Sequence, residues 1–348
     1  MKKRGIVDIQ FNWIFIIIAG ALILMFFVSL INKQRSLSDI RSSQTIASNL
    51  DSILTGAQIS TDTSNTIDLP AVPISFSCDD FSVGPVRRNL LLDIVFSPSL
   101  LRGKKMITWA LDWSVPFRVA NFLYLTDPEL RYIIVDNAKN LGRKIVDAMP
   151  KEVNKEVVAR ANVGSLIDKN NYHVRFVFLG DPPDTPFAQF QGMDPDAVSA
   201  VSFPDLADKG DILTTGRAAF YSFDKADGKF KSPQATFYLK EESFFGALFA
   251  PGADGYNCAM KKAFRKLERV AEMYASRSIS LQQYYGPGNP CSTHHRSNTI
   301  QEIGIAAKSQ SEKFPTTLAD IQKIQENARR LGDEQNQQLQ LISCPLIY

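Results

Sequence analysis

The first part of the chain changes from an uninterrupted apolar block to a polar block with a helical period. The apolar block, 11–31, reads FNWIFIIIAGALILMFFVSLI, and only Asn12 and Ser29 in it are clearly polar. A helix rises about 1.5 Å per residue, and a bilayer core needs roughly 20 apolar residues to be crossed. The pattern therefore predicts one transmembrane helix over 11–31.

The polar block that follows keeps apolar side chains at a spacing of three or four residues, as on one face of a helix. These side chains are Leu37, Ile40, Ala47, Leu50 and Leu54. We expect the membrane helix to continue to about Leu54 and to end at Gly56, with a polar linker over 60–66. Such a helix either stands free as a stalk or lies against the body and contributes to its core.

The middle of the chain mixes strand and helix patterns. Strands are predicted over 74–78, 90–96, 105–113, 117–125, 130–135, 172–179, 196–203 and 212–223. Helices are predicted over 138–148 and 154–161, and Asp227-Gly228 suits the turn of a hairpin that ends at 237–239. The mixture predicts an α+β or α/β mixed domain, with helices packed on a sheet.

The C-terminal part of the chain is predicted to be helical and to pack on that domain. Apolar residues from Tyr256 to Tyr274 fall on one helical face. The opposite face carries basic residues, namely Lys261, Lys262, Arg265, Lys266 and Arg269. This basic face suits solvent, an anionic lipid surface or an acidic partner. A later helix is predicted to start near Pro315, Thr316 and Thr317, and its apolar stripe suits core packing or self-association.

These patterns divide the chain into five segments. They are a basic cytoplasmic N-terminus at 1–10, the transmembrane helix at 11–31, a helical stalk and polar linker at 32–66, a mixed α/β domain at 67–250 and a disulfide-stapled helical tail at 251–348.

The composition supports a folded body and argues against nucleic acid as a partner. Of 348 residues, 45% are hydrophobic and 22% are charged, which is enough apolar material for a core. The formal net charge of +3 is too small to indicate nucleic-acid binding. The expected partners are the lipid bilayer and other proteins, or further copies of this chain, through the N-terminal or C-terminal helices.

Four cysteines, Cys78, Cys258, Cys291 and Cys344, all lie in the body. An even number without a C-x-x-C pair predicts two disulfides in an oxidising compartment, and the alternative is four buried thiols in a cytosolic domain. Three pairings are open. A bridge between two of the last three cysteines would staple the helical tail.

The charges beside the apolar block give a weak preference for the orientation. Residues 2–4 are basic before the block, and Lys33, Arg35 and Arg41 follow it. The cysteines favour the same answer, which is an N-terminus in the cytoplasm and a body outside the cell membrane. The apolar run is longer than that of a cleaved secretory signal, about 7–15 residues, and no small-residue cleavage site follows it, so we expect a retained anchor.

Lys3-Arg4-Gly5, followed at once by an apolar helix, resembles a class III (type IV prepilin-like) signal. The resemblance covers about the first thirty residues and implies cleavage between Gly5 and Ile6 on the cytoplasmic side, with the helix retained. It also implies that the processed subunit assembles through its N-terminal helix. Gln10 stands where that family usually has glutamate.

Few residues suggest a chemical site. Gly180-Asp181-Pro182-Pro183 follows a predicted strand, so Asp181 and Asp184 form either a ligand loop or an ordinary proline turn. His294 and His295 lie near Cys291, but adjacent histidines are poorly spaced for zinc, and we expect no metal and no cofactor. The sequence holds neither a P-loop nor a G-x-S-x-G motif.

Three functional hypotheses remain. The first is a non-enzymatic, membrane-anchored extracytoplasmic protein with a structural or binding role. The second is a pilin-like subunit processed after Gly5. The third is a cell-surface hydrolase, which would need two acids to converge from among Asp93, Asp112, Asp136, Asp181 and Asp184.

Overall fold

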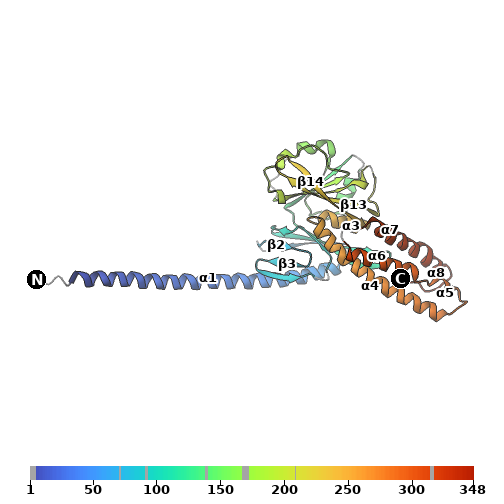
Figure 1. Cartoon of the computed structure of the whole chain (residues 1–348), viewed down its shortest axis with the longest axis horizontal. Coiled ribbons are helices and arrows are strands. Elements are labelled where there is room, and N and C mark those ends of the chain that lie inside the picture. Colours follow the sequence, from blue (N-terminus) through green and yellow to red (C-terminus); the bar gives the residue numbers. More distant parts are fainter. Residues whose placement is uncertain are drawn as a thin grey trace.

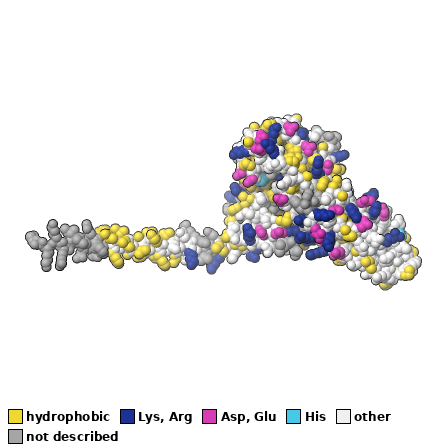
Figure 2. Space-filling view, viewed as in Figure 1, with side chains coloured by type: hydrophobic (Ala, Val, Ile, Leu, Met, Phe, Trp, Pro, Cys, Tyr) yellow, Lys and Arg dark blue, Asp and Glu magenta, His cyan; other side chains and the backbone are white. Residues whose placement is uncertain are grey.

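A computed structural model describes residues 5–69, 72–90, 93–137, 140–166, 172–207, 209–313 and 317–348. One helix, α1 (Gly5–Ile59), runs for 55 residues and projects from a body of sheets and helices (Figure 1). Its segment Trp13–Gln34 is long and apolar enough to cross a membrane, and none of it is buried by the body. Figure 2 shows this segment as a band of exposed hydrophobic side chains along the projecting arm.

The far end of α1 is seated in the body. Ser43, Ala47, Leu50 and Leu54 are buried at a spacing of three or four, and the last three join an apolar cluster with strand residues such as Phe81. The predicted face is therefore confirmed from Ala47 to Leu54 and contributes to the core. The side chain of Leu37 lies outside the described residues.

Two expectations about the end of this helix are wrong. The helix continues past Gly56 to Ile59, since an exposed glycine costs a helix only about 1 kcal/mol. Part of the predicted linker at 60–66 is instead a strand, β1 (Thr63–Asp68), which pairs with β7 at the edge of a sheet, where its mostly polar side chains remain in contact with solvent.

The described residues of the body form three sheets. The strands of the first, in the order β1-β7-β8-β5, are β7 (Lys105–Ser114), β8 (Arg118–Thr126) and β5 (Val95–Phe96) beside β1. The second, in the order β4-β3-β2-β6, contains β2 (Ile74–Phe76), β3 (Asp80–Val83), β4 (Val86–Asn89) and β6 (Leu100–Leu101). Of the strand predicted over 90–96, only β5 forms in the described part, and Leu91 and Leu92 lie outside it.

The third sheet has six strands in the order β10-β9-β11-β12-β13-β14. They are β9 (Leu130–Asp136), β10 (Lys155–Ala159), β11 (His173–Leu179), β12 (Val198–Phe203), β13 (Thr215–Asp224) and β14 (Lys229–Leu239). The first four in the sheet order are parallel, and the β13–β14 hairpin turns at Asp227-Gly228 as predicted. The helix predicted over 154–161 is wrong, because Val157 and Val158 pair beside β9 in β10.

Helices cover the sheets and form the tail (Figure 1). They are α2 (Leu141–Ala148), α3 (Lys240–Phe249), α4 (Ala253–Tyr285), α5 (Pro290–His294), α6 (Asn298–Glu312), α7 (Leu318–Arg329), a π-helical segment η5 (Arg330–Asn336) and α8 (Gln337–Leu341). Short 3-10 turns are η1 (Arg160–Ser165), η2 (Ala188–Phe190), η3 (Pro195–Ala197) and η4 (Pro204–Leu206). Thr317 caps α7 as predicted, whereas Ala138, Pro315 and Thr316 lie outside the described residues.

Both predicted disulfides are present, and each ties a helix to a distant part of the chain. Cys78 after β2 bonds to Cys258 in α4, across 180 residues, and Cys291 in α5 bonds to Cys344 near the C-terminus. The second bond staples the helical tail as expected. The mixed α/β body with an N-terminal apolar helix and a helical tail is thus confirmed.

Of the predicted basic face of α4, Arg265 and Arg269 are exposed, whereas Lys262 is buried. Its Nζ donates hydrogen bonds to the carbonyl oxygens of Cys78 at 2.5 Å and Leu90 at 2.7 Å, and lies 3.3 Å from a carboxylate oxygen of Asp79. Burial lowers the pKa of Lys262, while Asp79 opposes that shift. Lys262 lies one helical turn after Cys258 in the sequence. The disulfide of Cys258 and the ammonium group of Lys262 therefore hold the same part of α4 against the segment that contains Cys78.

Candidate functional site

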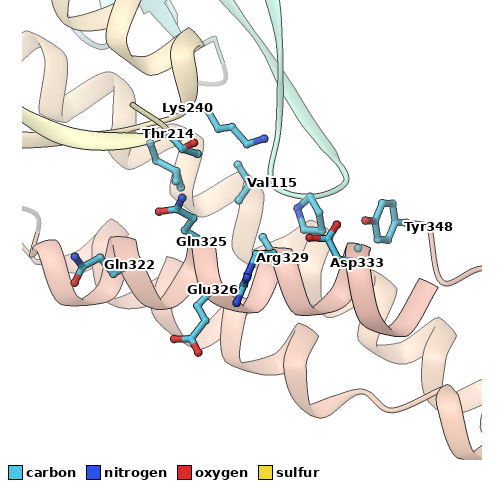
Figure 3. A pocket seen from close by; sticks show the side chains of 13 residues that line it. Val115, Thr214, Lys240, Gln322, Gln325, Glu326, Arg329, Asp333 and Tyr348 are labelled. Carbon is cyan, nitrogen blue, oxygen red and sulfur yellow. The ribbon is translucent and has the colours of Figure 1, made fainter. Parts of the chain in front are cut away.

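A groove of about 690 Å³ lies between the C-terminal helices and the sheets (Figure 3). Its walls come from the β7–β8 turn, the β14–α3 corner, one face of α7 with η5, and the C-terminal residue. Concave sites of about 300–1,000 Å³ are the usual size of small-ligand sites. We call it the junction groove. Its lining residues are Val115, Pro116, Thr214, Leu239, Lys240, Gln322, Gln325, Glu326, Ala328, Arg329, Gly332, Asp333 and Tyr348.

One wall of the junction groove is the exposed side of α7. Ile321, Ile324 and Leu331 anchor this stretch in the core, which leaves polar side chains such as Gln322 and Gln325 to line the groove. At Arg330 the helix widens into η5, where Asn336 is buried. π-Helical turns of this kind often occur at functional sites.

The opposite wall has a strained corner. Lys240, the first residue of α3 directly after β14, has a φ of 73°, a left-handed conformation that is uncommon for a residue with a side chain. A 2.6 Å hydrogen bond from the Lys240 N–H to the Thr214 carbonyl holds it there. The side chain of Lys240 is half-buried and lines the groove (Figure 3). Strain of about 1–3 kcal/mol persists only where the surroundings enforce it, and it clusters at functional sites.

The C-terminal residue closes one end of the groove. Tyr348 packs over Gly332, where an added Cβ would lie 3.1 Å from the tyrosine hydroxyl oxygen, so a side chain at this position would require the tyrosine to shift by a few tenths of an ångström. The ring also contacts Phe117 edge to face, and the preceding N–H, of Ile347, donates to Asn336 at 3.0 Å. Burial and the nearby Asp333 raise the pKa of Tyr348. The tail that carries Tyr348 is held by the Cys291–Cys344 disulfide.

The charged residues that line the junction groove are of both signs. Lys240 and Arg329 are opposed by Glu326 and Asp333. Glu326 is paired with Arg330 at 2.6 Å, whereas Lys240, Arg329 and Asp333 make no ion pair with another described residue. The groove therefore presents amides, hydroxyls and charges of both signs rather than a field of one sign.

The sequence-predicted ligand loop lies elsewhere, at the carboxyl ends of the parallel strands. A hollow of about 510 Å³ there is lined by Asp136, Asn137, Arg160, Pro183 and Thr185, with Ala159 and Ala161. Asp181 contributes its carbonyl oxygen, which accepts a hydrogen bond from Arg160 at 2.5 Å. The carboxylates of Asp181 and Asp184 are exposed and make no hydrogen bond among the residues described. The loop is thus at the expected edge without a built binding site.

The five acids considered for a hydrolase are scattered. Asp136 and Asp181 follow neighbouring strands, but an oxygen of Asp136 accepts the Gly142 N–H at 2.8 Å and so serves the start of α2. Asp112 pairs with Arg118 at 2.7 Å, at the β7–β8 hairpin. The carbonyl of Asp93 faces Lys262 at 3.4 Å. No pair of carboxylates is seen facing a common cavity among these described acids.

The histidines and cysteines make internal contacts. Both ring nitrogens of buried His295 face carbonyl oxygens, those of Cys291 at 2.8 Å and Pro345 at 2.9 Å. Cys78, Asp79 and Cys258 bring potential metal-ligand atoms within 4.8 Å of one another, but the two cysteines are joined in a disulfide. These groups therefore explain how the tail and α4 are fastened.

His173 has a partner that the sequence pattern did not reveal. Its Nε2 lies 3.0 Å from the hydroxyl oxygen of Ser199 on the neighbouring strand β12. Burial, with a smaller contribution from the positive charge of Arg175, lowers the pKa of His173 to about 4. The ring is therefore neutral at pH 7, when it can hydrogen-bond with Ser199 without a charge in the sheet.

We expect this histidine to make the protein acid-sensitive. Because its folded-state pKa lies below the unfolded value of 6.5, the unfolded state binds the proton first as the pH falls. The contribution of His173 is present above pH 6.5 and is lost towards pH 4, by about 3 kcal/mol in total. Urea unfolding at a series of pH values should show a smaller loss over this range for His173→Gln. An equal loss in both proteins would contradict the assignment.

Comparison with protein-family models, with curated proteins and with solved structures finds no match for this chain. The residues of the junction groove were not expected from the sequence, because they come from distant segments and share no motif. The one local signal was the pattern of polar residues opposite the apolar stripe of the helix that begins near Thr317.

Proposed function

We propose that this chain is a single-pass membrane protein with its N-terminus in the cytoplasm and its body outside the cell membrane, where it has a binding or structural role. The observation that carries the proposal is the continuity of α1. The same helix has an exposed apolar segment, Trp13–Gln34, and a buried seat at Ala47, Leu50 and Leu54. An anchor joined to the core in this way holds the body at a defined distance from the bilayer.

The disulfides support the side of the membrane that we propose. Disulfides persist in oxidising compartments and are rare in the cytosol. All four cysteines of the body are paired, and both bonds join segments at least 53 residues apart. A body built around such bonds is suited to the outside of the cell.

Lysine labelling of intact cells tests this orientation. A membrane-impermeant amine reagent is expected to label exposed lysines of the body, such as Lys308 and Lys323, in intact cells. Lys2 and Lys3 are expected to react only after lysis, or to be absent if the N-terminus is processed. Labelling of body lysines only after lysis would contradict the proposed orientation.

A pilin-like subunit is the second candidate, favoured by the unbroken helix that runs through the apolar segment and reaches the seat in the body. In this version a peptidase cuts between Gly5 and Ile6, and the subunit assembles through α1. Mass spectrometry of the intact chain decides between the two: a start at Ile6 supports processing, and a start at Met1 or Lys2 contradicts it. The same spectrum should gain about four mass units on reduction, from two disulfides.

A further inference from the structure

We propose that the junction groove binds a neutral oligosaccharide; this rests on the binding role proposed above and names its ligand class. The first argument is charge. Two cations and two anions line the groove, and the pairing of Glu326 with Arg330 leaves an excess of one positive charge, too small to favour a phosphate-rich polymer and of the wrong sign for a polycation. A ligand that carries hydroxyl groups instead of charge matches such a surface.

The second argument is the kind of polar group that lines the groove. Gln322 and Gln325 each carry two amide donors and an acceptor, Asp333 supplies carboxylate acceptors, and Thr214 and Tyr348 supply hydroxyls. In Figure 3 the amide of Gln325 points towards Thr214, and Asp333 lies between the β7–β8 turn and Tyr348. Vicinal sugar hydroxyls, which both donate and accept, suit groups of this kind.

The third argument excludes an extended peptide. Peptides are commonly held through main-chain hydrogen bonds to a free strand edge. Here the N–H groups of Val115, Leu239 and Lys240 already donate to Phe117, Ser243 and Thr214, and Pro116 has none. The carbonyl of Leu239 accepts from the Trp113 indole at 3.2 Å. The α7 wall is a helix with its main chain bonded internally.

The shape of the groove also suits sugar rings. The helical wall from Gln322 to Asp333 extends over about 16 Å at 1.5 Å per residue, which is longer than one ring. Val115 and Ala328 are buried, but the partly exposed Pro116 provides apolar surface beside the polar groups, against which the C–H face of a sugar ring can pack. The strained Lys240 and the disulfide-held Tyr348 fix the two sides in place, so little ordering is needed on binding.

Titration calorimetry of the full chain in lipid nanodiscs tests the proposal, since glycoside detergents would compete for the groove. The probes are maltotriose, cellotriose, mannotriose and chitotriose, with an oligogalacturonate and a set of unstructured peptides for comparison. We expect at least one neutral trisaccharide to bind with a Kd below about 1 mM. Gln325→Ala and Asp333→Ala should each weaken this binding about tenfold.

Gln338→Ala is the matched control, because Gln338 is exposed on α8 and does not line the groove. Its binding should equal that of the unmodified chain. Absence of binding by every neutral trisaccharide, binding of the acidic sugar or the peptides alone, or full binding by both groove variants would overturn the inference. Lysine labelling separates the two proposals: a body outside the cell that binds no sugar removes only the groove inference.

Discussion

Replacing Cys78 and Cys258 together by serine is expected to lower the free energy of unfolding by about 5 kcal/mol. The bond closes a loop across 180 residues. In the chain-entropy model a disulfide stabilises the folded state because it lowers the conformational entropy of the unfolded chain, and this effect grows with loop length. The bond also joins the sheet that seats α1 to the helix α4. Urea unfolding followed by tryptophan fluorescence measures the effect, because Trp109 and Trp113 are buried in the core.

The second disulfide provides the matched control. Replacing Cys291 and Cys344 by serine involves the same chemistry over 53 residues, for which the same model gives about 4 kcal/mol. That change should loosen the tail and Tyr348 while amide exchange in β2 and β3 remains slow. In the Cys78/Cys258 variant, exchange in β2 and β3 should become fast. If the two variants gave the same exchange pattern, the Cys78–Cys258 bond would not be the joint that we describe.

Sequence patterns predict most directly those elements that bury one face in the core and expose the other face to solvent. The face of α1 from Ala47 to Leu54 could be identified, because this part of the helix shows one face to the core and one to solvent. The strand β11 was also identified, although every residue from Val174 to Leu179 is buried and neither of its faces meets solvent. α3 could not be identified, because every residue from Ser243 to Phe249 is buried and no period remains. β10 was mistaken for a helix because its parallel partner β9 lies in a separate segment.

The candidate site depends even more on tertiary structure. Lys240 carries no signal in the sequence, since its left-handed φ follows from the meeting of β14 with α3 and from a hydrogen bond to Thr214. Tyr348 reaches the groove only because a disulfide and Asn336 hold the chain end. Asp181 was expected from its place after a strand, and it lies at the predicted edge of the sheet. The shape of a site at that edge depends on which strands are neighbours, and sequence patterns do not give the order of the strands.

Replacing Leu50 and Leu54 together by alanine is expected to release the end of α1 from the body. Both side chains are 2% exposed and pack in one cluster with Ile74, Phe81 and Met106. Each truncation costs about 2–5 kcal/mol in lost burial and an added cavity, and the pair shares neighbours, so the two costs will not add simply. The six-stranded sheet has its own core, so it should stay folded while amides of 43–59 lose their protection from hydrogen exchange.

Asn49→Ala with Ser52→Ala is the control, since these residues lie on the same turns of α1 but are exposed. Slow exchange in 43–59 should persist in this control. The comparison bears on the proposed function, because an anchor sets the distance of the body from the bilayer only while its helix is seated. If the Leu50/Leu54 variant kept full protection in 43–59, α1 would be held mainly by other contacts, such as that of Ser43 with the β3–β4 turn at Gly84. Loss of protection throughout the six-stranded sheet would instead mean that the seat and the rest of the body unfold as one unit.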